Sequence, residues 1–256
     1  CYLFCYNMTT ERVKIEQKEE KFSLVELGKT LVSSRALIGI VLAALLLLLA
    51  QLTLGGMGQY IFPNYFQSAA GVSISGLCGN ILILVLAFFV PSLAAKFGKK
   101  ELSAFGGLFG AVVFFIAFIL HTDNMYLYIA LYTLGYLGIA FFNINCWAMI
   151  TDVIDDAEVR QGERSDGTFY SVYSFARKMG QAASSGLTGG LLTMVGYSTA
   201  TAFDTEVVNG IYDIACIVPA AGFLLMALAL IFVYPLSKKK VDSNIAYLKA
   251  KREGKK

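Results

Sequence analysis

The chain has 256 residues, of which 57% are hydrophobic and only 15% are charged, and its formal net charge is +3. Soluble domains carry charge on about a quarter of their residues, so this composition excludes an ordinary soluble protein. The apolar residues also form unbroken blocks such as residues 36–50, which indicates helices that cross a membrane.

The first segment reads Cys-Tyr-Leu-Phe-Cys-Tyr and is followed by a polar stretch. We interpret residues 1–7 as the cytoplasmic end of a preceding transmembrane helix. A signal peptide would carry its charge before the apolar residues and not after them. Residues 8–35 are predicted to be a cytoplasmic linker. Within it, residues 23–34 place leucines on one face behind a capping serine, which is typical of a short amphipathic helix on the membrane surface. The chain is therefore expected to be the second half of a larger protein.

Six apolar segments follow, each long enough to cross a bilayer, which takes about 20 helical residues. They lie at about residues 36–60, 73–95, 102–121, 125–151, 167–195 and 209–235. All but two of the 21 lysines and arginines lie before the first span, in alternate loops or after the last span. The positive-inside rule then places both ends in the cytoplasm, and the positive charge gives no reason to expect nucleic acid. The sequence predicts an all-α polytopic membrane protein with six transmembrane helices over residues 36–236 and a basic cytoplasmic tail over 237–256.

The first span ends in a glycine-rich segment, residues 51–66, which contains Pro63. We expect this segment to be unwound, because irregular backbone at membrane depth is tolerated where it lines a cavity. The fourth span carries an aromatic and amide stripe within an arc of about 60°. Its members are Tyr132, Tyr136, Asn143 and Trp147. Such groups suit a water-filled cavity, although tyrosines near a helix end also form interfacial belts.

A run of charges, residues 151–167, follows the fourth span. Its carboxylates include Asp152, Asp155, Asp156 and Glu158, and Arg164 lies among them. Clustered carboxylates could bind Mg²⁺, but no phosphate-binding glycine loop or histidine accompanies them. The five cysteines likewise form no metal-ligand spacing with the single histidine, so no metal site is expected. The mixed charges favour an ion-paired lock that meets basic residues of a partner bundle, and a solvated loop remains the alternative.

Arg177 and Lys178 lie side by side near the middle of the fifth span. Each such charge costs roughly 2.5–3.5 kcal/mol at a bilayer centre on insertion scales. Lys178 shares a polar arc of about 80° with Gln181 and several serines, whereas the opposite side carries mostly small residues, and Gly186 and Gly190 form a GxxxG pair that suits close helix packing. We therefore expect Lys178 to face a wet cavity. Arg177 either shares that role or anchors the bundle by pairing with a carboxylate.

The segment DVIDDAEVRQGERSDGTFYSVYSFARKMGQA, residues 152–182, resembles the glycoside–pentoside–hexuronide:cation symporters. This family is the branch of the major facilitator superfamily that includes melibiose permease. Supporting matches are TTERV at 9–13, KFGKK at 96–100 and YPLSKKK at 234–240. The words SFARKMGQA are most similar to the glucuronide-carrier subgroup. The chain departs from the family pattern at 156–157, 159–160 and 166.

The resemblance implies that the chain is the C-terminal six-helix bundle of such a transporter, built as two inverted three-helix repeats. It implies that Lys178 lies near the sugar and cation sites, with Arg177 beside it, and that a cytoplasmic gate contains Asp152, Asp155, Glu158 and Arg164. The candidates for contacting the sugar are Tyr132, Tyr136, Asn143, Trp147 and Gln181. The coupling cation would be Na⁺ or H⁺, with no cofactor, and the substrate would be a glucuronide, galactoside or xyloside.

The partners expected from the resemblance are the N-terminal six-helix half, which would supply most of the sugar and cation site, and the lipid bilayer of a bacterial-type cytoplasmic membrane. This half alone is not expected to transport. Two alternatives stay open. One is a membrane-embedded, Mg²⁺-dependent lipid phosphotransferase that uses the carboxylates at 152–158, and the other is an inert structural subunit. The structural subunit gives no reason to bury Lys178, and the phosphotransferase lacks the phosphate-binding motifs that would accompany its carboxylates, so the sequence favours a symporter over an enzyme.

Overall fold

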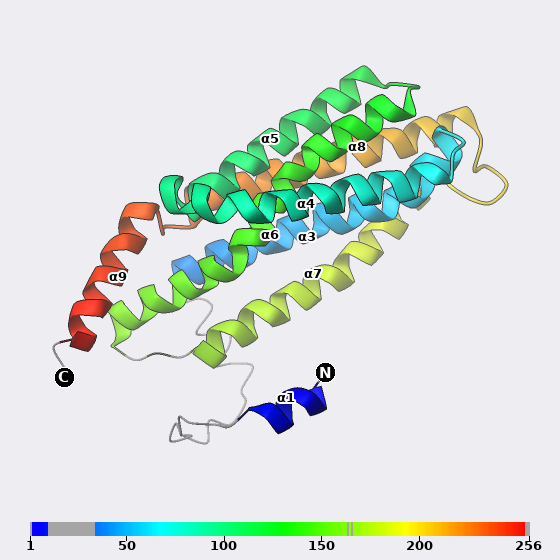
Figure 1. Cartoon of the computed structure of the whole chain (residues 1–256). Helices are drawn as coiled ribbons and strands as arrows, with labels where there is room; N and C mark the ends of the chain where they lie inside the picture. The colour runs from blue at the N-terminus through cyan, green and yellow to red at the C-terminus, as the bar shows by residue number, and fades with distance from the viewer. Residues whose placement is uncertain (1, 10–33, 163, 165, 254–256) are drawn as a thin grey trace.

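The computed structural model of the chain describes residues 2–9, 34–162, 164 and 166–253. All regular elements in these residues are helices (Figure 1). They are α1 (Tyr2–Met8), α3 (Arg35–Tyr60), η1 (Ile61–Tyr65), α4 (Ala70–Phe97), α5 (Lys99–Leu120), α6 (Met125–Gln161), α7 (Asp166–Met194), α8 (Thr205–Leu228), η2 (Ala229–Val233) and α9 (Lys238–Glu253). Among the described residues, 5 helices are long and apolar enough to cross a membrane: α3 with η1, α4, α5, α6, and α8 with η2. The prediction of an all-helical polytopic membrane protein is therefore confirmed.

Helix α7 coincides with the predicted fifth span and is 29 residues long. It is not among the five apolar helices, because its serines, its glycines and the Arg177–Lys178 pair make it too polar. The count of six spans therefore stays a prediction, which depends on α7 crossing the membrane beside other protein groups.

The glycine-rich end of the first span is helical, so the expectation of an unwound segment is wrong. Helix α3 continues to Tyr60, and Pro63 lies in the π-helical turn η1. Proline lacks an N–H and its ring clashes with the carbonyl four residues earlier, and the wider π turn relieves that clash. Helix α7 lies against one of these glycines, since a methyl group at Gly56 would lie 3.0 Å from Thr188 Cγ2, whereas Gly55 and Gly58 have open space beside them.

Helix α6 is longer than its predicted span. It has 37 residues and ends at Gln161, where Gly162 adopts the left-handed conformation with φ of 82°. At 1.5 Å per residue it is about 55 Å long, against about 30 Å for the hydrocarbon core of a bilayer. The carboxylates from Asp152 onward therefore lie on the final turns of this helix. The predicted basic tail also contains a helix, α9, which the sequence analysis did not foresee.

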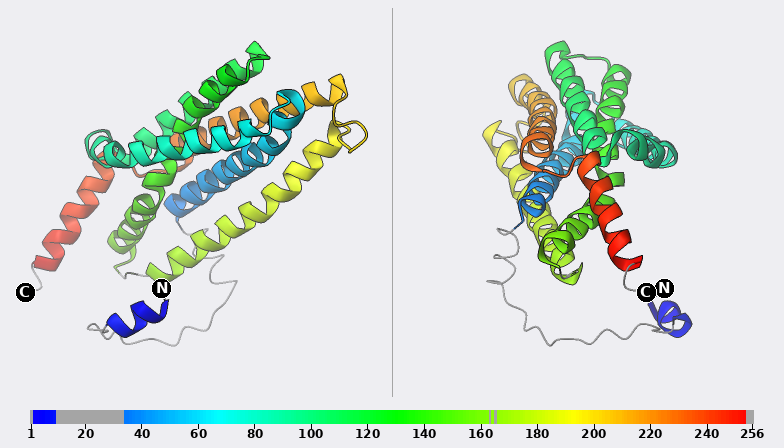
Figure 2. Two further views of the ribbon diagram at one scale, coloured as in Figure 1. Left: turned by 45° about the vertical axis from the view of Figure 1, so that its right-hand side comes forward. Right: turned by 90° about the vertical axis from the view of Figure 1, so that its left-hand side faces the viewer.

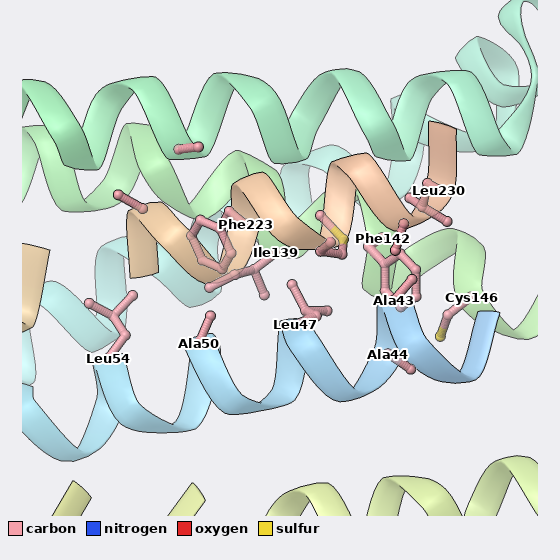
Figure 3. Close-up of a cluster of buried hydrophobic side chains, with 14 of the residues drawn as sticks. Ala43, Ala44, Leu47, Ala50, Leu54, Ile139, Phe142, Cys146, Phe223 and Leu230 are labelled. Atoms are coloured by element: carbon pink, nitrogen blue, oxygen red, sulfur yellow. The ribbon is translucent and has the colours of Figure 1, made fainter. Parts of the chain in front are cut away.

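The core lies between α3, α5, α6 and α8, where Leu47, Phe142 and Phe223 are buried (Figure 3). Helix α7 packs mainly on α3, and α4 packs mainly on α6, so both lie at the outside of the bundle (Figure 2). These two outer helices leave much of their surface exposed, and α4 presents large apolar side chains such as Phe88.

Helices α5 and α6 cross with their backbones in contact. A methyl group at Gly110 would lie 2.8 Å from the carbonyl oxygen of Gly135, and one at Gly138 would lie 2.8 Å from that of Gly106. Real side-chain carbons do not approach this closely, so only glycine fits at these positions. Small residues at a crossing are a common device for packing helices in membranes.

Part of the predicted N-terminal region lies outside the described residues, namely the linker from residue 10 to 33 with its amphipathic helix. Ser34 is described, and its Oγ accepts a hydrogen bond from the Leu37 backbone N–H at 3.3 Å to cap α3. Helix α1 exposes apolar side chains, including Leu3 and Phe4. Its assignment to the end of a preceding transmembrane helix stays a prediction.

Candidate functional site

Lys178 lies in the middle of α7 with its side chain exposed on the surface of this chain. Its Nζ donates a hydrogen bond to Gln181 Oε1 at 3.2 Å, which is a neutral partner. No ion pair of Lys178 occurs among the described residues. The sequence of α3 and α4 contains no aspartate or glutamate, and α7 has none after Asp166. The charge of Lys178 therefore has no counter-ion near it within the described part of the chain.

A groove between α3 and α7 begins beside Gln181. Its volume is about 570 Å³, within the range of roughly 300–1,000 Å³ that small-molecule sites occupy. It is lined by Leu52, Gly56, Gln59, Tyr60, Gln181, Ser184, Ser185 and Thr188. Gln181 is the one residue of the predicted site that lines it. Gln59 and Ser185 were not predicted as site residues, although both belong to polar stretches of the sequence, and nothing in the sequence singled out Thr188.

The residues of the predicted aromatic and amide stripe on α6 do not share one environment: some are buried in the core, and others contact neighbouring helices. Tyr132 is buried, and its ring stacks on Tyr136 with centroids 5.4 Å apart. Asn143 Nδ2 donates to Gln51 Oε1 at 3.2 Å and joins α6 to α3. Tyr132 is thus a core residue in this conformation. The contact of Tyr136 and Asn143 with a sugar stays a prediction.

Arg177 is held by aromatic rings and has no carboxylate partner among the described residues. Its guanidinium carbon lies 5.8 Å from the centre of the Trp147 ring and 5.7 Å from that of Tyr173. Its Nη1 also donates to Tyr173 Oη at 3.2 Å. Within the described residues, aromatic faces take the place that the sequence analysis gave to a carboxylate, and the pairing of Arg177 with a carboxylate stays a prediction.

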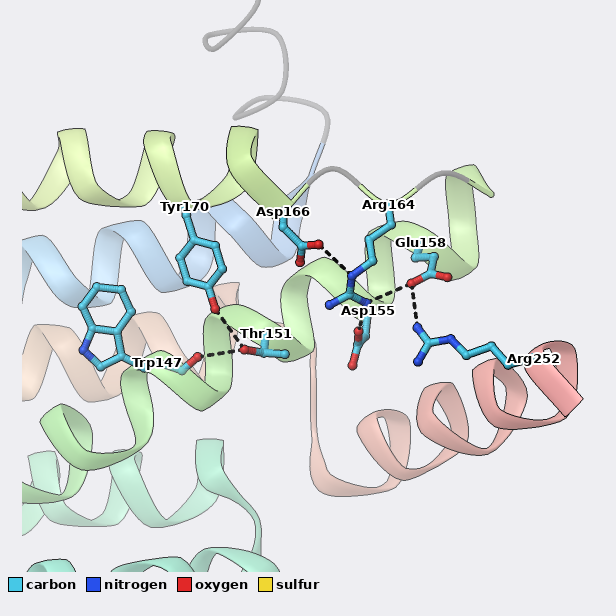
Figure 4. Close-up of polar contacts among 8 residues, drawn as sticks. All are labelled: Trp147, Thr151, Asp155, Glu158, Arg164, Asp166, Tyr170 and Arg252. Carbon is cyan, nitrogen blue, oxygen red and sulfur yellow. Dashed lines mark hydrogen bonds and ion pairs between the residues drawn. The ribbon is translucent and has the colours of Figure 1, made fainter. Parts of the chain in front are cut away.

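A network of ion pairs lies at the end of α6 (Figure 4). Arg164 Nη1 contacts Asp155 Oδ1 at 2.7 Å and Glu158 Oε2 at 2.9 Å, and its Nε contacts Asp166 Oδ2 at 2.8 Å. Arg252 of α9 reaches the same Glu158 oxygen at 3.2 Å. Hydrogen bonds to these carboxylates, with Asp166 contributing most, raise the pKa of Arg164 above its ordinary value. The network therefore joins α6, the start of α7 and α9.

Two further carboxylates of α6 are buried and paired. Asp152 lies 2.7 Å from Lys99 Nζ at the start of α5. Asp156 pairs with Arg160 at 2.9 Å and accepts a hydrogen bond from Asn244 Nδ2 of α9 at 3.0 Å. The predicted lock thus consists of ion pairs, and within the described residues its basic partners are Lys99, Arg160, Arg164 and Arg252. Pairing with a partner bundle stays a prediction.

The three aspartates that could have bound Mg²⁺ point in different directions. Asp152 faces α5, Asp155 faces Arg164, and Asp156 faces α9. Within the described residues there is no group of three or more histidine, cysteine or acidic side chains that could hold a metal ion. This arrangement does not favour the phosphotransferase hypothesis.

Long apolar helices, a groove lined by hydroxyl and amide groups, and a charge network at one end are the features of a multi-pass membrane protein. Residues 1–238 match the family model described as MFS/sugar transport protein, and the chain belongs to that family. This match confirms the resemblance to the glycoside–pentoside–hexuronide:cation symporters.

The relatives are transporters and not enzymes. The chain is 28% identical over 252 residues to the uncharacterized symporter YjmB of Bacillus subtilis strain 168. The aligned region covers 93% of this chain and 52% of that protein. It is 27% identical over 246 residues to the glucuronide carrier protein homolog of Escherichia coli K12, with 93% and 52% covered. It is 28% identical over 183 residues to the sodium-dependent lysophosphatidylcholine symporter 1 of Xenopus tropicalis, with 68% and 34% covered. The chain spans about half the length of the first two relatives.

Proposed function

We propose that this chain supplies the C-terminal six-helix half of a secondary-active symporter. The symporter couples the flow of Na⁺ or H⁺ to the uptake of a glycoside by alternating access. Three observations support this: the match to the family, the span of about half of its relatives, and the polar outer helix α7. A helix too polar for lipid on all sides is expected to meet a second bundle and a water-filled cavity.

The observation that carries the proposal is the exposed Lys178 next to the groove between α3 and α7. Amide and hydroxyl groups of Gln59, Gln181, Ser185 and Thr188 match the hydroxyl groups of a sugar. The stretch of α7 from Gln181 to Thr188 is about 10 Å long, which suits a glycoside. An unneutralised ammonium group at one end of this stretch would attract a carboxylate, either of the substrate or of the missing half.

Among glucuronides, galactosides and xylosides, this arrangement favours a glucuronide. The carboxylate of a glucuronide would pair with Lys178 while its ring hydroxyls lie along the groove. One relative named for glucuronide transport agrees with this choice. The name of the Xenopus relative includes sodium dependence, which makes Na⁺ the first cation to test.

The test is uptake by the full-length protein in vesicles, with Lys178→Met compared with the wild type. Hydrogen bonds to charged groups contribute about 1.5–3 kcal/mol, so uptake of the glucuronide at low concentration should fall about 10- to 150-fold. A neutral glycoside should lose less than the glucuronide. Replacing Na⁺ by choline, at fixed pH, separates sodium from proton coupling.

The matched control is Lys96→Met, because Lys96 is an exposed lysine at the end of α4 whose Nζ lies over the Phe97 ring. It should leave uptake unchanged. Coupled uptake that survives Lys178→Met at the wild-type rate would exclude a role for Lys178. Absence of any glycoside uptake by the wild type, across the three sugar classes, would refute the proposed function itself.

A further inference from the structure

Helices α6 and α7 touch at few places, and their main contact is aromatic. The Trp147 ring of α6 packs against Tyr170 and Tyr173 of α7, with centroids 6.2 Å and 5.6 Å apart. The hydroxyl groups of Thr151 and Tyr170 lie 3.2 Å apart and extend this contact by one turn of α6 (Figure 4). Arg177 completes it, with its guanidinium near both the Trp147 and the Tyr173 ring. We call Trp147, Tyr173 and Arg177 the aromatic clasp.

We propose that Arg177 is a positioning residue: through the aromatic clasp it fixes the rotation of α7 and so holds Lys178 and Gln181 at the groove. This inference rests on the proposed function, because it concerns how the same groove is kept in shape. It gives separate roles to two adjacent cations: Arg177 packs against the aromatic rings, and Lys178 faces the ligand.

The geometry of a helix links the two residues. Consecutive side chains point about 100° apart, so the direction of Arg177 determines that of Lys178. Ser174 and Ser185 lie within about 40° of Lys178 and move with it. Because Arg177 reaches α6 on one side, Lys178 must point away from that contact, toward the exposed face that also carries Ser174 and Ser185.

Toward its far end, α7 packs on α3, with Ser184 and Leu192 buried, and leaves its other faces open. No atom of another helix lies within 4 Å of where a methyl group would stand on Gly186, Gly189 or Gly190. At Gly180 the neighbour is the flexible end of Leu45, whose Cδ2 would lie 2.9 Å from such a methyl group. The contact with α3 therefore holds α7 along one side. The aromatic clasp is the contact that fixes the rotation of α7 relative to α6.

The chemistry of arginine suits this role better than that of lysine. A guanidinium is flat, weakly hydrated and able to stack on aromatic faces, so part of its charge is compensated without a carboxylate. A lysine at the same place would keep the charge and part of the attraction to the rings, but not the flat face that a guanidinium offers to them. The proposal therefore predicts that Arg177→Lys is impaired although it keeps the charge.

The experiment measures the direction of α7 separately from transport. Ser185→Cys in the full-length protein reports the exposed face through its rate of reaction with a water-soluble maleimide, above the background of the native cysteines. This rate is compared in the wild type, Arg177→Gln, Arg177→Lys, Trp147→Leu and Trp147→Phe. Ser243→Cys on the exposed side of α9 is the control site. The KM for the glycoside is measured in parallel, without the cysteine.

We expect Arg177→Gln, Arg177→Lys and Trp147→Leu to change the rate at position 185 and to raise KM. The expected size is about 5- to 30-fold, the range that one cation–π contact supports. Trp147→Phe keeps a ring and should stay within about twofold of the wild type, and position 243 should not change in any variant. Because the labelling does not need transport, a wild type without uptake would refute the proposed function and leave this test intact.

Two results would overturn the proposal. One is wild-type labelling and KM in Arg177→Lys, which would show that the charge alone matters. The other is a failure of both the Arg177→Gln and the Trp147→Leu proteins to accumulate in the membrane. That result would show that the aromatic clasp is needed for folding and not for positioning.

Discussion

The pair formed by Lys99 and Asp152 should respond asymmetrically to mutation. The Asp152 side chain is 6% exposed, whereas that of Lys99 is 30% exposed and reaches solvent. Lys99→Met leaves a buried carboxylate without its cation. Asp152→Asn leaves a lysine that can turn toward water and an amide oxygen that still accepts its hydrogen bond. We therefore expect the lysine variant to be the less stable of the two.

The magnitudes follow from the contact distance. At 2.7 Å, and with an effective dielectric constant of about 20, the attraction between the charges is about 6 kcal/mol before desolvation is subtracted. Removing one partner of a buried pair typically costs about 3–5 kcal/mol, which we expect for Lys99→Met. Asp152→Asn should cost about 1–2 kcal/mol, near the value of one hydrogen bond. The double variant Lys99→Met/Asp152→Leu removes both charges and should lie close to the wild type.

The assay is the free energy of unfolding in mixed micelles for the wild type, the two single variants and the double variant. Lys238→Met serves as the control, because it breaks an exposed pair with Asp242 and should cost less than about 1 kcal/mol. Equal losses in the two single variants, or a double variant no better than Lys99→Met, would refute the argument from burial.

Two further predictions concern packing and the ion-pair network. Gly138→Ala should lower the free energy of unfolding by about 1–3 kcal/mol, because its methyl group would meet the Gly106 carbonyl. Gly186→Ala, which meets nothing within 4 Å, should be neutral or slightly stabilising, and equal effects in a thermal melt would contradict the close crossing. Glu158→Gln weakens contacts to both Arg164 and Arg252, so amide exchange in α9 should speed up relative to that in α5. Unchanged amide exchange in α9 would show that the ion pair between Glu158 and Arg252 does not hold α9 in place.

The sequence predicted the membrane helices well because apolar blocks and helix length are properties of the chain itself. It predicted their ends less well. Helix α6 continues past its apolar block, since pairs such as Asp156 with Arg160, four residues apart, stabilise a helix in water. Pro63 was expected to break a helix, and only the packed structure shows that a π turn accommodates it.

The candidate site was predictable where a residue has a high free-energy cost in the membrane, because such a residue requires a functional or structural explanation. A lysine at membrane depth drew attention to Lys178 and its neighbour Gln181. The partners of the charged residues were not predictable, because Lys99 lies 53 residues from Asp152 along the chain and Arg252 lies 94 from Glu158. The contact of Arg177 with Trp147 likewise depends on the rotation of two helices, which periodicity on either helix alone cannot give.

The glycine-mediated crossing of α5 and α6 has a mechanical consequence. The backbones touch at Gly106, Gly110, Gly135 and Gly138, and Phe114 and Phe141 pack onto two of these glycines, so the two helices should tilt together as one rigid unit. If the bundle rocks during transport, bending would concentrate where the helical hydrogen bonding changes, at the π turns η1 and η2 near the ends of the first and last membrane helices.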